Sequence, residues 1–504
     1  MTASPEKIFA GLGGAFFVGG AVRDAILGRV SPDIDIAVSP GKARACAQKL
    51  AKAFGGNWFT LDEETGVYRV NARSPFAFQI DVAAFQGKDM DADLRRRDFT
   101  VNSAAYPVTA PFSITQAEGG LRFLLGDAKK LLDPLGAARD CGKKTIAPCG
   151  KTIFRDDPLR MMRVFRNAAE LDFSVSPALP PLVKKHRALI DGVAGERVRE
   201  ELLRTLAVPR SKYWLEQMDG AGLLTAVFPE LEPQRKCALV YYGKGGVLRH
   251  TLDVVDRMEY LLAHLPRVFP EFKNQLAPFA RRASILKFAA LLHDIAKPAT
   301  AKKIDGRLRF FLHEEQGARM AEGEMRRLHF SKADMRLVCA MIAGHLRPGH
   351  LATGAEITPR AVYRYFRETG DAALPLLLLC WADYASYLTY AQLEKLLPDT
   401  GREPFALTKK LPQQGPLKTL RHMQLVNHMF RLYFSQTARV LPQRVIDGNT
   451  VMKALRIKPG RVIGRILDEI SLAQVDGKVK NRADALAFVK KLNVKKLEKE
   501  AAAK

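Results

Sequence analysis

The sequence predicts an α+β protein in which a small N-terminal mixed sheet is followed by a mostly α-helical body. Short apolar runs bordered by glycine or aspartate, at Ala15–Gly19, Ile34–Val38 and Gln79–Ala83, indicate half-buried strands. From about residue 156 onward, apolar residues recur at helical spacing, as they do through 159–165. A chain of 504 residues with 47% hydrophobic residues also has enough apolar material for several packed cores.

Four regions are expected along the chain. Candidate boundaries are the glycine- and lysine-rich stretch 141–151, the glycine-rich stretch 242–246 and the proline- and glycine-containing segment 398–416. The predicted regions are a mixed α/β region at 1–140, helical regions at 141–235 and 236–398, and a basic helical region at 399–504.

The charge of the chain predicts a polyanionic partner. Its formal net charge is +26, and residues 401–504 alone contain 22 lysines and arginines against 8 acidic residues. A basic surface of this kind binds nucleic acid by releasing counterions, whereas the alternative is a merely solvated helical face. A membrane partner is not expected, because the longest strongly apolar run, Leu374–Cys380, is far shorter than the ~20 residues of a spanning helix.

The compartment is predicted from the N-terminus and the cysteines. The N-terminus has no long apolar stretch of the kind found in signal peptides. The six cysteines are scattered and none has Cys-x-x-Cys spacing, which argues against a zinc finger or a disulfide framework. We therefore expect a cytoplasmic protein with reduced thiols. The sequence gives no indication of its oligomeric state.

The first group of chemically informative residues combines glycines, an arginine and two aspartates. The segment Phe17–Asp24 reads FVGGAVRD and is followed by Asp33-Ile-Asp35. On a strand, residues two apart point the same way, so Asp33 and Asp35 would present two carboxylates suited to Mg²⁺. The glycine pair would let the backbone approach a phosphate closely. A later strand-like stretch carries a third carboxylate, Asp81, which could equally be a solvent-facing acid.

Two further segments are rich in arginine. Residues 94–103 read LRRRDFTVNS, which is either a solvated helix start or an anion clamp. Residues 155–166 read RDDPLRMMRVFR, in which Asp157 and Arg160 lie three apart and share a face of a helix. This pair either forms a surface ion pair or recognises the edge of a base. In the second case the Asp157 carboxylate is the hydrogen-bond acceptor and the Arg160 guanidinium is the donor.

Taken in order, these motifs resemble the class II tRNA nucleotidyltransferase and bacterial poly(A) polymerase family over about residues 14–205. The resemblance implies a polymerase-beta-like nucleotidyltransferase head at 1–140 and a helical neck with the base-reading motif at 141–235. It implies transfer of a nucleotide from CTP or ATP to the 3′-hydroxyl of tRNA, with Mg²⁺ as cofactor and release of pyrophosphate. The implied catalytic residues are Asp33, Asp35 and Asp81, with Asp33 and Asp35 holding the metal. The implied nucleotide-binding residues are Gly19, Gly20, Arg23, Asp24, Arg96, Arg97, Asp98, Asn102, Asp157, Arg160 and Arg163.

The chain departs from the family pattern at two places. The base-reading motif usually begins Glu-Asp, but here it is Asp156-Asp157, which keeps the charge and shortens the reach. Only the short segment 82–97 separates Asp81 from Asp98, whereas enzymes that build the whole CCA end carry a longer flexible loop there. The missing loop favours a CC-adding enzyme that works with a separate A-adding enzyme, unless the segment 110–120 replaces the loop.

A second group of residues resembles an HD domain, expected at 236–398. Histidines and aspartates occur in a recognisable order, and the pair His293-Asp294 ends an apolar helix. The resemblance implies a site for a divalent transition metal such as Mn²⁺, Ni²⁺, Co²⁺ or Fe²⁺, and hydrolysis of phosphate esters at 3′ ends by a metal-activated water. A vestigial spacer without metal is the alternative. A site for two metal ions that includes His313 and His345 is a further alternative that the sequence does not decide. The four defining positions are His250, His293, Asp294 and Asp383.

The C-terminal part is expected to bind RNA. From Val445 onward the sequence reads as helix, turn and helix, with Pro459 and Gly460 in the turn. The pattern resembles the family's C-terminal body and tail, which grips the acceptor arm of tRNA, and a plain basic hairpin is the alternative. The implied phosphate contacts are Arg456, Lys458, Arg461 and Arg465.

Three other functions compete with tRNA nucleotidyl transfer. A poly(A) polymerase would carry nearly the same head motifs. A metal-dependent phosphohydrolase would use the N-terminal half for substrate recognition only. An RNA-binding protein with inactive sites is the non-enzyme alternative, and the complete acid and histidine sets argue against it.

Overall fold

The computed structural model describes residues 4–63, 65–354, 356–407, 411–412, 415–494 and 497–498, so most of the basic end at 495–504 lies outside the described residues. The chain divides into two compact units. One comprises Met1–Val208 and Tyr213–Val227, and the other comprises Pro209–Lys212 and Phe228–Lys504. None of the described helices is long and apolar enough to span a membrane.

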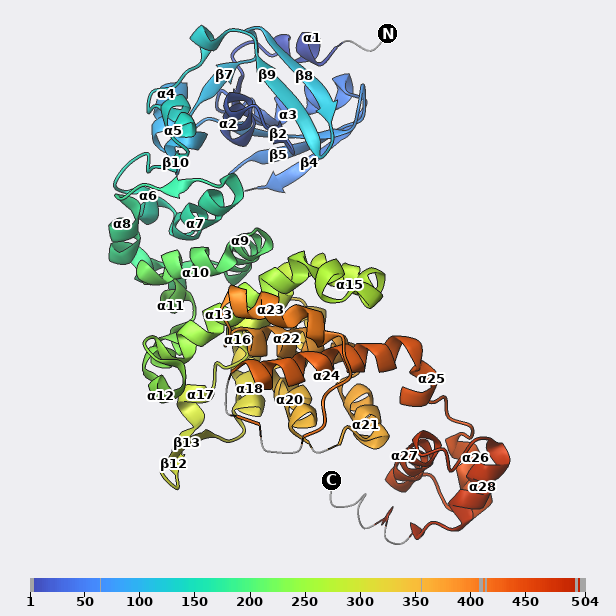
Figure 1. Ribbon diagram of the computed structural model, residues 1–504. Helices are drawn as coiled ribbons and strands as arrows, with labels where there is room; N and C mark the ends of the chain where they lie inside the picture. The colour runs from blue at the N-terminus through green and yellow to red at the C-terminus, as the bar shows by residue number, and fades with distance from the viewer. Residues whose placement is uncertain are drawn as a thin grey trace. The chain divides into compact units, whose positions relative to one another are not determined.

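The first unit begins with a six-stranded mixed sheet in the order β4-β5-β6-β3-β1-β7, in which only β3 and β6 are parallel (Figure 1). A second sheet has the order β2-β9-β8, and β10 pairs with β11. The expected strands at Ile34–Val38 and Gln79–Ala83 are confirmed. The strands are β1 (Phe16–Val18), β2 (Val30–Ser31), β3 (Ile34–Val38), β4 (Asn57–Asp62), β5 (Val67–Ala72), β6 (Phe78–Ala84), β7 (Ala105–Pro107), β8 (Phe112–Ala117), β9 (Gly120–Leu125), β10 (Thr145–Ile146) and β11 (Ser174–Val175).

One core joins these sheets to the first helices. Inward-facing residues of β1, β3 and β6, such as Phe17, Ile36 and Ile80, are buried, and they pack with apolar residues of α2 and α3. The helices of this part of the chain are α1 (Pro5–Ala10), α2 (Gly19–Leu27), α3 (Ala43–Ala53), α4 (Met90–Arg95), α5 (Ala137–Gly142), α6 (Ile153–Asp156), α7 (Arg160–Leu171), α8 (Leu179–His186), α9 (Gly195–Ala207), α10 (Ser211–Gly220) and α11 (Leu224–Val227).

The second unit is almost wholly helical. The helices α13, α16, α22 and α24, labelled in Figure 1, bury their apolar faces against one another: α13 packs against both α16 and α22, and α22 packs against α24. Its helices are α12 (Leu239–Tyr242), α13 (Gly246–Ala263), α14 (Leu265–Val268), α15 (Lys273–Ala280), α16 (Ala283–Leu292), α17 (Lys297–Thr300), α18 (His313–Arg327), α19 (Lys332–Gly344), α20 (Leu346–Thr353), α21 (Pro359–Thr369), α22 (Ala373–Ala385), α23 (Tyr390–Thr400), α24 (Pro416–Ser435), α25 (Thr437–Val440), α26 (Gly448–Leu455), α27 (Arg461–Val475) and α28 (Arg482–Lys490).

Two details differ from the sequence-based expectations. The body is not helical throughout, because β12 (Ala301–Ile304) and β13 (Arg307–Phe310) form an antiparallel hairpin whose short, exposed, basic strands bury too little to show a clear pattern. The predicted boundaries at 140 and 398 fall inside α5 and α23, so the four-region division remains a prediction.

Candidate functional site

The first site lies in the N-terminal unit, where aspartates of β3 and β6 lie beside the glycine pair at the start of α2. Asp35 is on β3 and pairs in register with Asp81 on the parallel strand β6. Asp33 precedes β3 by one residue, so it stands in the bend before the strand rather than on the strand itself. Burial, together with the like charges of Asp33 and Asp81, raises the pKa of Asp35 to about 7. A cation at this edge would relieve that repulsion.

Gly19 is the residue at which the backbone comes close to the carboxylate of Asp35. It begins α2 with a φ of +66°, and a Cβ built on it would lie 2.7 Å from Oδ2 of Asp35. A side chain at this position is therefore excluded by backbone conformation and by contact with a carboxylate. The glycine pair lets the backbone at the start of α2 lie directly beside the acidic group.

We expect Gly19→Ala to reduce the nucleotide transfer that the sequence resemblance implies by about 100-fold or more, because a displacement of the acid by a fraction of an ångström misaligns the reacting atoms. Gly28→Ala is the matched control: Gly28 also has a left-handed φ of +67°, but nothing lies within 4 Å of its Cβ position. The control should lose about 1 kcal/mol of stability and keep its activity. Steady-state kinetics with CTP and melting curves measure both. Equal losses of activity in the two variants would contradict the assignment.

A cavity of about 570 Å³ contains most of the predicted site residues. Within it, Arg23 donates to both carboxylate oxygens of Asp24 at 2.9 and 3.0 Å and to Oδ1 of Asn102 at 2.9 Å. The Asn102 amide in turn donates to Asp98 at 3.3 Å. Asn102 thus joins the glycine-rich segment to the arginine-rich one. The predicted residues that line this cavity are Gly19, Gly20, Arg23, Asp24, Asp33, Asp35, Asp81, Arg97, Asp98, Asn102, Arg160 and Arg163.

Asp98 is buried and charged. Burial would raise its pKa, but the Arg163 guanidinium 2.8 Å away, together with the backbone N–H of Phe99, holds the pKa of the Asp98 carboxyl below its usual range. Arg163 comes from α7, so this ion pair ties the helical neck to the segment of the head that carries the arginines.

Arg160 and Asp157 do not form an ion pair with each other in the described structure. Asp157 accepts hydrogen bonds from the backbone N–H of Leu159 at 3.1 Å and from Arg197 at 3.2 Å. The Nε and Nη1 atoms of Arg160 are buried without a hydrogen-bond partner among the described residues. A buried guanidinium edge without partners is costly unless a ligand completes it. This observation favours a base-reading role over a surface ion pair.

Two predicted residues lie elsewhere or are already engaged. Arg96 lines a neighbouring cavity of about 390 Å³ together with Asp35, Asp81 and Arg160. Asp81 accepts two hydrogen bonds of 2.7 Å from Arg69 of β5, which sits opposite it in the strand register. The role of Arg69 was missed because a lone arginine in a strand carries no motif, although strand pairing places it beside the acid.

The second site lies in the helical unit, where five elements bring together six side chains of the kinds that can ligate a metal ion. His250 is on α13, His293 and Asp294 follow α16, and Asp383 is on α22; His313 begins α18 and His345 follows α19. They form two groups of three in which the ligand atoms lie within 4.8 Å of one another. The groups are His250, His293 and Asp383, and Asp294, His313 and His345.

Three groups of this cluster are in the charge state that suits metal binding; for His293, burial lowers the pKa but the adjacent Asp294 carboxylate outweighs it and raises the pKa of the imidazole. Burial would raise the pKa of both carboxyls, but His293 and Lys297 hold the pKa of Asp294 well below its usual range, and His250 lowers the pKa of Asp383 to about 2. Burial lowers the pKa of His345 to about 3, so its ring is neutral at neutral pH. Charged carboxylates and a neutral imidazole are the forms that bind divalent ions.

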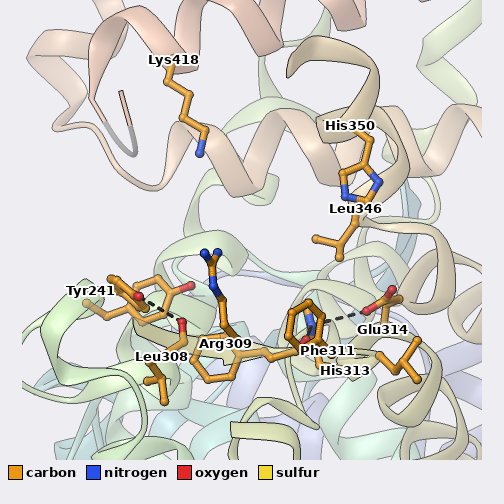
Figure 2. Close-up of a pocket in the computed structure, with 12 residues that line it drawn as sticks. Tyr241, Leu308, Arg309, Phe311, His313, Glu314, Leu346, His350 and Lys418 are labelled. Atoms are coloured by element: carbon orange, nitrogen blue, oxygen red, sulfur yellow. Dashed lines mark hydrogen bonds and ion pairs between the residues drawn. The ribbon is translucent and has the colours of Figure 1, made fainter. Parts of the chain in front are cut away.

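A cavity of about 580 Å³ opens beside this cluster. Figure 2 shows Arg309 of β13, His350 of α20 and Lys418 of α24 pointing into it from three elements. Phe311, which is 63% exposed, lies at its edge. Cations and an exposed ring around a hollow are suited to a phosphate and a base. The sequence carried no signal for this group, because its members are dispersed over more than a hundred residues.

The two sites together define a class of protein: a nucleotide-binding head with convergent carboxylates, followed by a helical body with an HD-type cluster of histidines and aspartates. The model of the Poly A polymerase head domain matches residues 15–126, that of the probable RNA and SrmB-binding site of polymerase A matches 172–235, and that of the HD domain matches 247–388.

Known proteins resemble the chain over nearly its whole length. A CC-adding tRNA nucleotidyltransferase from Geobacter sulfurreducens is 30% identical over 95% of this chain and 92% of its own. An A-adding tRNA nucleotidyltransferase from Deinococcus radiodurans is 29% identical over 95% of both chains. A solved apo structure of a CCA-adding enzyme has the same fold, with a TM-score of 0.60 at 17% identity, covering 96% of this chain and 92% of its own. The chain belongs to the tRNA nucleotidyltransferase and poly(A) polymerase family.

Proposed function

We propose that this protein adds cytidines to the 3′ end of tRNA from CTP and stops after two. The transfer itself is supported by the acid pair beside the glycine turn in an arginine-lined cavity. The hard carboxylate oxygens of Asp33 and Asp35 fit Mg²⁺, which when bound supplies Lewis-acid stabilisation of the phosphoryl charge. In the reaction the 3′-oxygen bonds to the α-phosphorus while the bond to the pyrophosphate oxygen breaks.

The protein's own groups bind and orient the nucleotide. Arg97 is anchored to Asp93 by hydrogen bonds of 3.0 and 3.1 Å, so its planar guanidinium is held at the cavity wall for the triphosphate. The buried edge of Arg160, with Asp157 three residues earlier, offers donors and an acceptor to the edge of the base. The base is thus chosen by protein side chains, with no nucleic-acid template.

The stop after two cytidines rests on the connection between β6 and α4. Strand β6 ends at Ala84 and α4 begins at Met90, so there is no room for a long flexible insertion. The segment 110–120 does not replace it, because β8 and β9 pair there in continuous register from Phe112↔Leu125 to Ala117↔Gly120. In a regular hairpin the backbone N–H and C=O groups form the hydrogen bonds between the two strands. Such a hairpin therefore cannot reshape a pocket as a flexible loop can.

The test uses tRNA transcripts that end at the discriminator base, at C and at CC, incubated with CTP, ATP or both and resolved to one nucleotide. We expect one or two C additions on the shorter ends and no A on the CC end. Addition of A to the CC end would refute the stop, and a lone A added only to CC ends would define an A-adding enzyme. Long A tracts would indicate a poly(A) polymerase.

Replacing Arg160 tests the base-reading assignment. We expect Arg160→Ala to raise the KM for CTP about 10- to 100-fold and to reduce discrimination against UTP, because a charge-assisted hydrogen bond is worth ~1.5–3 kcal/mol. Arg155→Ala is the control, since Arg155 is exposed on the preceding helix α6. Competition assays with paired nucleotides provide the measurement. An unchanged CTP-to-UTP ratio in Arg160→Ala would contradict the assignment.

Binding of the tRNA body is proposed for the C-terminal helices. Arg456, Lys458 and Arg461 are exposed around the turn between α26 and α27, and Arg465 lies one turn further along α27. This segment has a small core of its own, so the turn is held in place while its side chains remain in solvent. Such contacts would weaken steeply with salt.

A second activity, phosphomonoester or cyclic phosphodiester hydrolysis at RNA 3′ ends, is proposed for the HD cluster. It is favoured by buried ligand atoms that converge on one another: Nε2 of His250 lies 3.2 Å from Oδ1 of Asp383, and Nε2 of His293 lies 3.2 Å from Oδ2 of Asp294. A divalent transition metal such as Mn²⁺, Ni²⁺, Co²⁺ or Fe²⁺ fits this mixed donor set and when bound activates water for hydrolysis. Arg309 and Lys418 would hold the phosphate, and Phe311 would stack on the terminal base.

RNA ending in a 3′-phosphate or a 2′,3′-cyclic phosphate, incubated with each metal, tests this activity. Asp383→Asn should abolish hydrolysis and leave nucleotide addition intact, since Asp383 belongs to the other compact unit. No hydrolysis by the wild-type protein with any of the four metals would refute the proposal.

A further inference from the structure

The hairpin of β12 and β13 is exposed along most of its length. Figure 1 shows it extending away from the helices of the second unit. The two-residue turn Asp305-Gly306 joins its strands, and both residues have the positive φ angles, 49° and 73°, that a tight hairpin turn requires. None of the hairpin's residues is fully buried, and only Leu308 and Phe310 are half-buried. Its other side chains are therefore available to a ligand.

The exposed side chains of the hairpin are mostly cationic. Lys302 lies directly opposite Arg309 in the strand register, where like charges repel each other. The hairpin's one acidic residue, Asp305, is in the turn. None of the cations forms an ion pair with another residue that the structure describes. An anion lying over the strands would remove the repulsion. The cations are Lys302, Lys303, Arg307 and Arg309.

Most of these cations lie on one face of the hairpin. Residues paired across two antiparallel strands share a face, as do residues two apart on one strand. Figure 2 shows Arg309 pointing into the cavity beside the HD cluster, so the face that includes Arg309 continues the wall of that cavity. Lys303 is on the opposite face, where it pairs with Leu308. The cavity-side face consists of Lys302, Ile304, Arg307 and Arg309.

Two hydrogen bonds hold the base of the hairpin beside the cavity. The Tyr241 hydroxyl of α12 donates to the carbonyl oxygen of Leu308 at 3.1 Å. The carbonyl oxygen of Phe310 lies 2.6 Å from Nδ1 of His313, which belongs to the HD cluster. The fold therefore fixes the direction in which the cavity-side face leaves the cavity. A chain-like ligand with one end in the cavity would pass over this face.

Exposed apolar side chains accompany the cations. Ile304 is 40% exposed on the cavity-side face, and Phe311 and Leu312, which line the cavity, are 63% and 59% exposed. Cations along a backbone path, combined with apolar surfaces on which bases stack, are features of sites for single-stranded nucleic acid. Residues two apart on a strand, such as Arg307 and Arg309, are about 7 Å apart, so they can meet successive phosphates of an extended strand. Duplex RNA fits this surface less well, because side chains cannot read its deep, narrow major groove.

We propose that the β12–β13 hairpin guides single-stranded RNA into the cavity, and that Lys302 and Arg307 hold the phosphates preceding the 3′-terminal nucleotide. The inference deepens the hydrolytic function proposed for the HD cluster, and it rests on that function for the identity of the RNA end. It specifies the part of the substrate that is recognised, namely the unpaired nucleotides next to the 3′ end.

RNA binding measured without hydrolysis tests the inference. Full-length protein in chelator is titrated with a short, unstructured, 5′-labelled oligoribonucleotide that ends in a 3′-phosphate, which the head cannot extend. Fluorescence anisotropy at several salt concentrations gives the dissociation constant. We expect Lys302→Ala with Arg307→Ala to weaken binding about tenfold at low salt, and to reduce the slope of log K against log salt by about 1.4, as the loss of two phosphate contacts on a single strand does.

A matched pair of single variants separates position from charge. Lys302 and Lys303 are adjacent and both exposed, but they lie on opposite faces of the hairpin. Lys302→Ala should weaken binding about threefold, whereas Lys303→Ala should leave it unchanged. A 4-thiouridine placed two nucleotides before the 3′ end should crosslink to residues 301–312 of the wild-type protein, as located by mass spectrometry.

Equal affinities of Lys302→Ala and Lys303→Ala, or crosslinks only outside residues 301–312, would overturn the inference. Equal weakening of single-strand and duplex binding in the double variant would overturn the choice of a single strand. If the double variant fails to fold, the crosslinks of the wild-type protein decide. RNA bound by the hairpin but hydrolysed with none of the four metals would refute the hydrolytic activity and leave the guide standing. Hydrolysis by the double variant with the kcat/KM of the wild type would do the reverse.

Discussion

Replacing Asp33 and Asp35 by asparagine is expected to lower nucleotide addition about 1,000-fold or more. The loss follows because a metal ion held by these carboxylates supplies several kcal/mol of charge stabilisation in the transition state. The fold should not suffer: Asp35 is half-buried beside Asp33 and Asp81, and neutral amides remove the like-charge repulsion that helps to raise its pKa. The melting temperature in chelator is therefore expected to stay the same or rise while activity is lost.

The matched control is Asp91→Asn, which removes an exposed acid of the same head that pairs with Arg95 in an i,i+4 ion pair. It should leave transfer unchanged. Hydrolysis at the HD cluster should also persist in the double variant. Residual transfer within tenfold of wild type would show that the acid pair is not the metal site, and a fall in melting temperature parallel to activity would indicate a structural role.

Glu201→Ala is expected to produce the largest loss of stability, about 3–5 kcal/mol, because it leaves a buried guanidinium without its main partner. Arg166 of α7 donates to Glu201 of α9 at 2.7 Å, and both side chains are buried. Melting curves and hydrogen exchange of peptides covering α7 and α9 measure the effect. Because α7 begins at Arg160, faster exchange there should be accompanied by weaker CTP binding.

Two comparisons separate this effect from a general loss of charge. Asp91→Asn, which breaks an exposed ion pair, should change stability by no more than about 0.5 kcal/mol. Replacing both partners with apolar residues, Arg166→Met with Glu201→Leu, should recover part of the loss, since neither charge is then left buried alone. A double variant less stable than Glu201→Ala would contradict this account.

Overall sequence identity does not decide which base is added. The CC-adding and A-adding relatives match this chain almost equally well, at 30% and 29%. The assignment of the added base therefore has to rest on local features of this chain rather than on overall identity. The direct connection from β6 to α4 is the local feature that supports our CC assignment.

The sequence by itself determined the fold class and the family, and it named most of the residues that the structure brings together in the head cavity and in the histidine–aspartate cluster. Strand and helix periodicity reflect local burial, so β3 was predicted with its observed bounds. Motifs such as FVGGAVRD and His293-Asp294 are contiguous because a turn or a helix end builds them from neighbouring residues.

Only the tertiary structure decided how separate segments combine. Arg69 engages Asp81 because strands β5 and β6 pair in a register that no motif records. The buried edge of Arg160 without partners follows from how α7 packs. Asp294 faces two groups of histidines because α13, α18 and the end of α19, which lie about 20 to 50 residues away in the sequence, converge on it. Contacts between distant segments depend on packing, which single-sequence patterns do not encode.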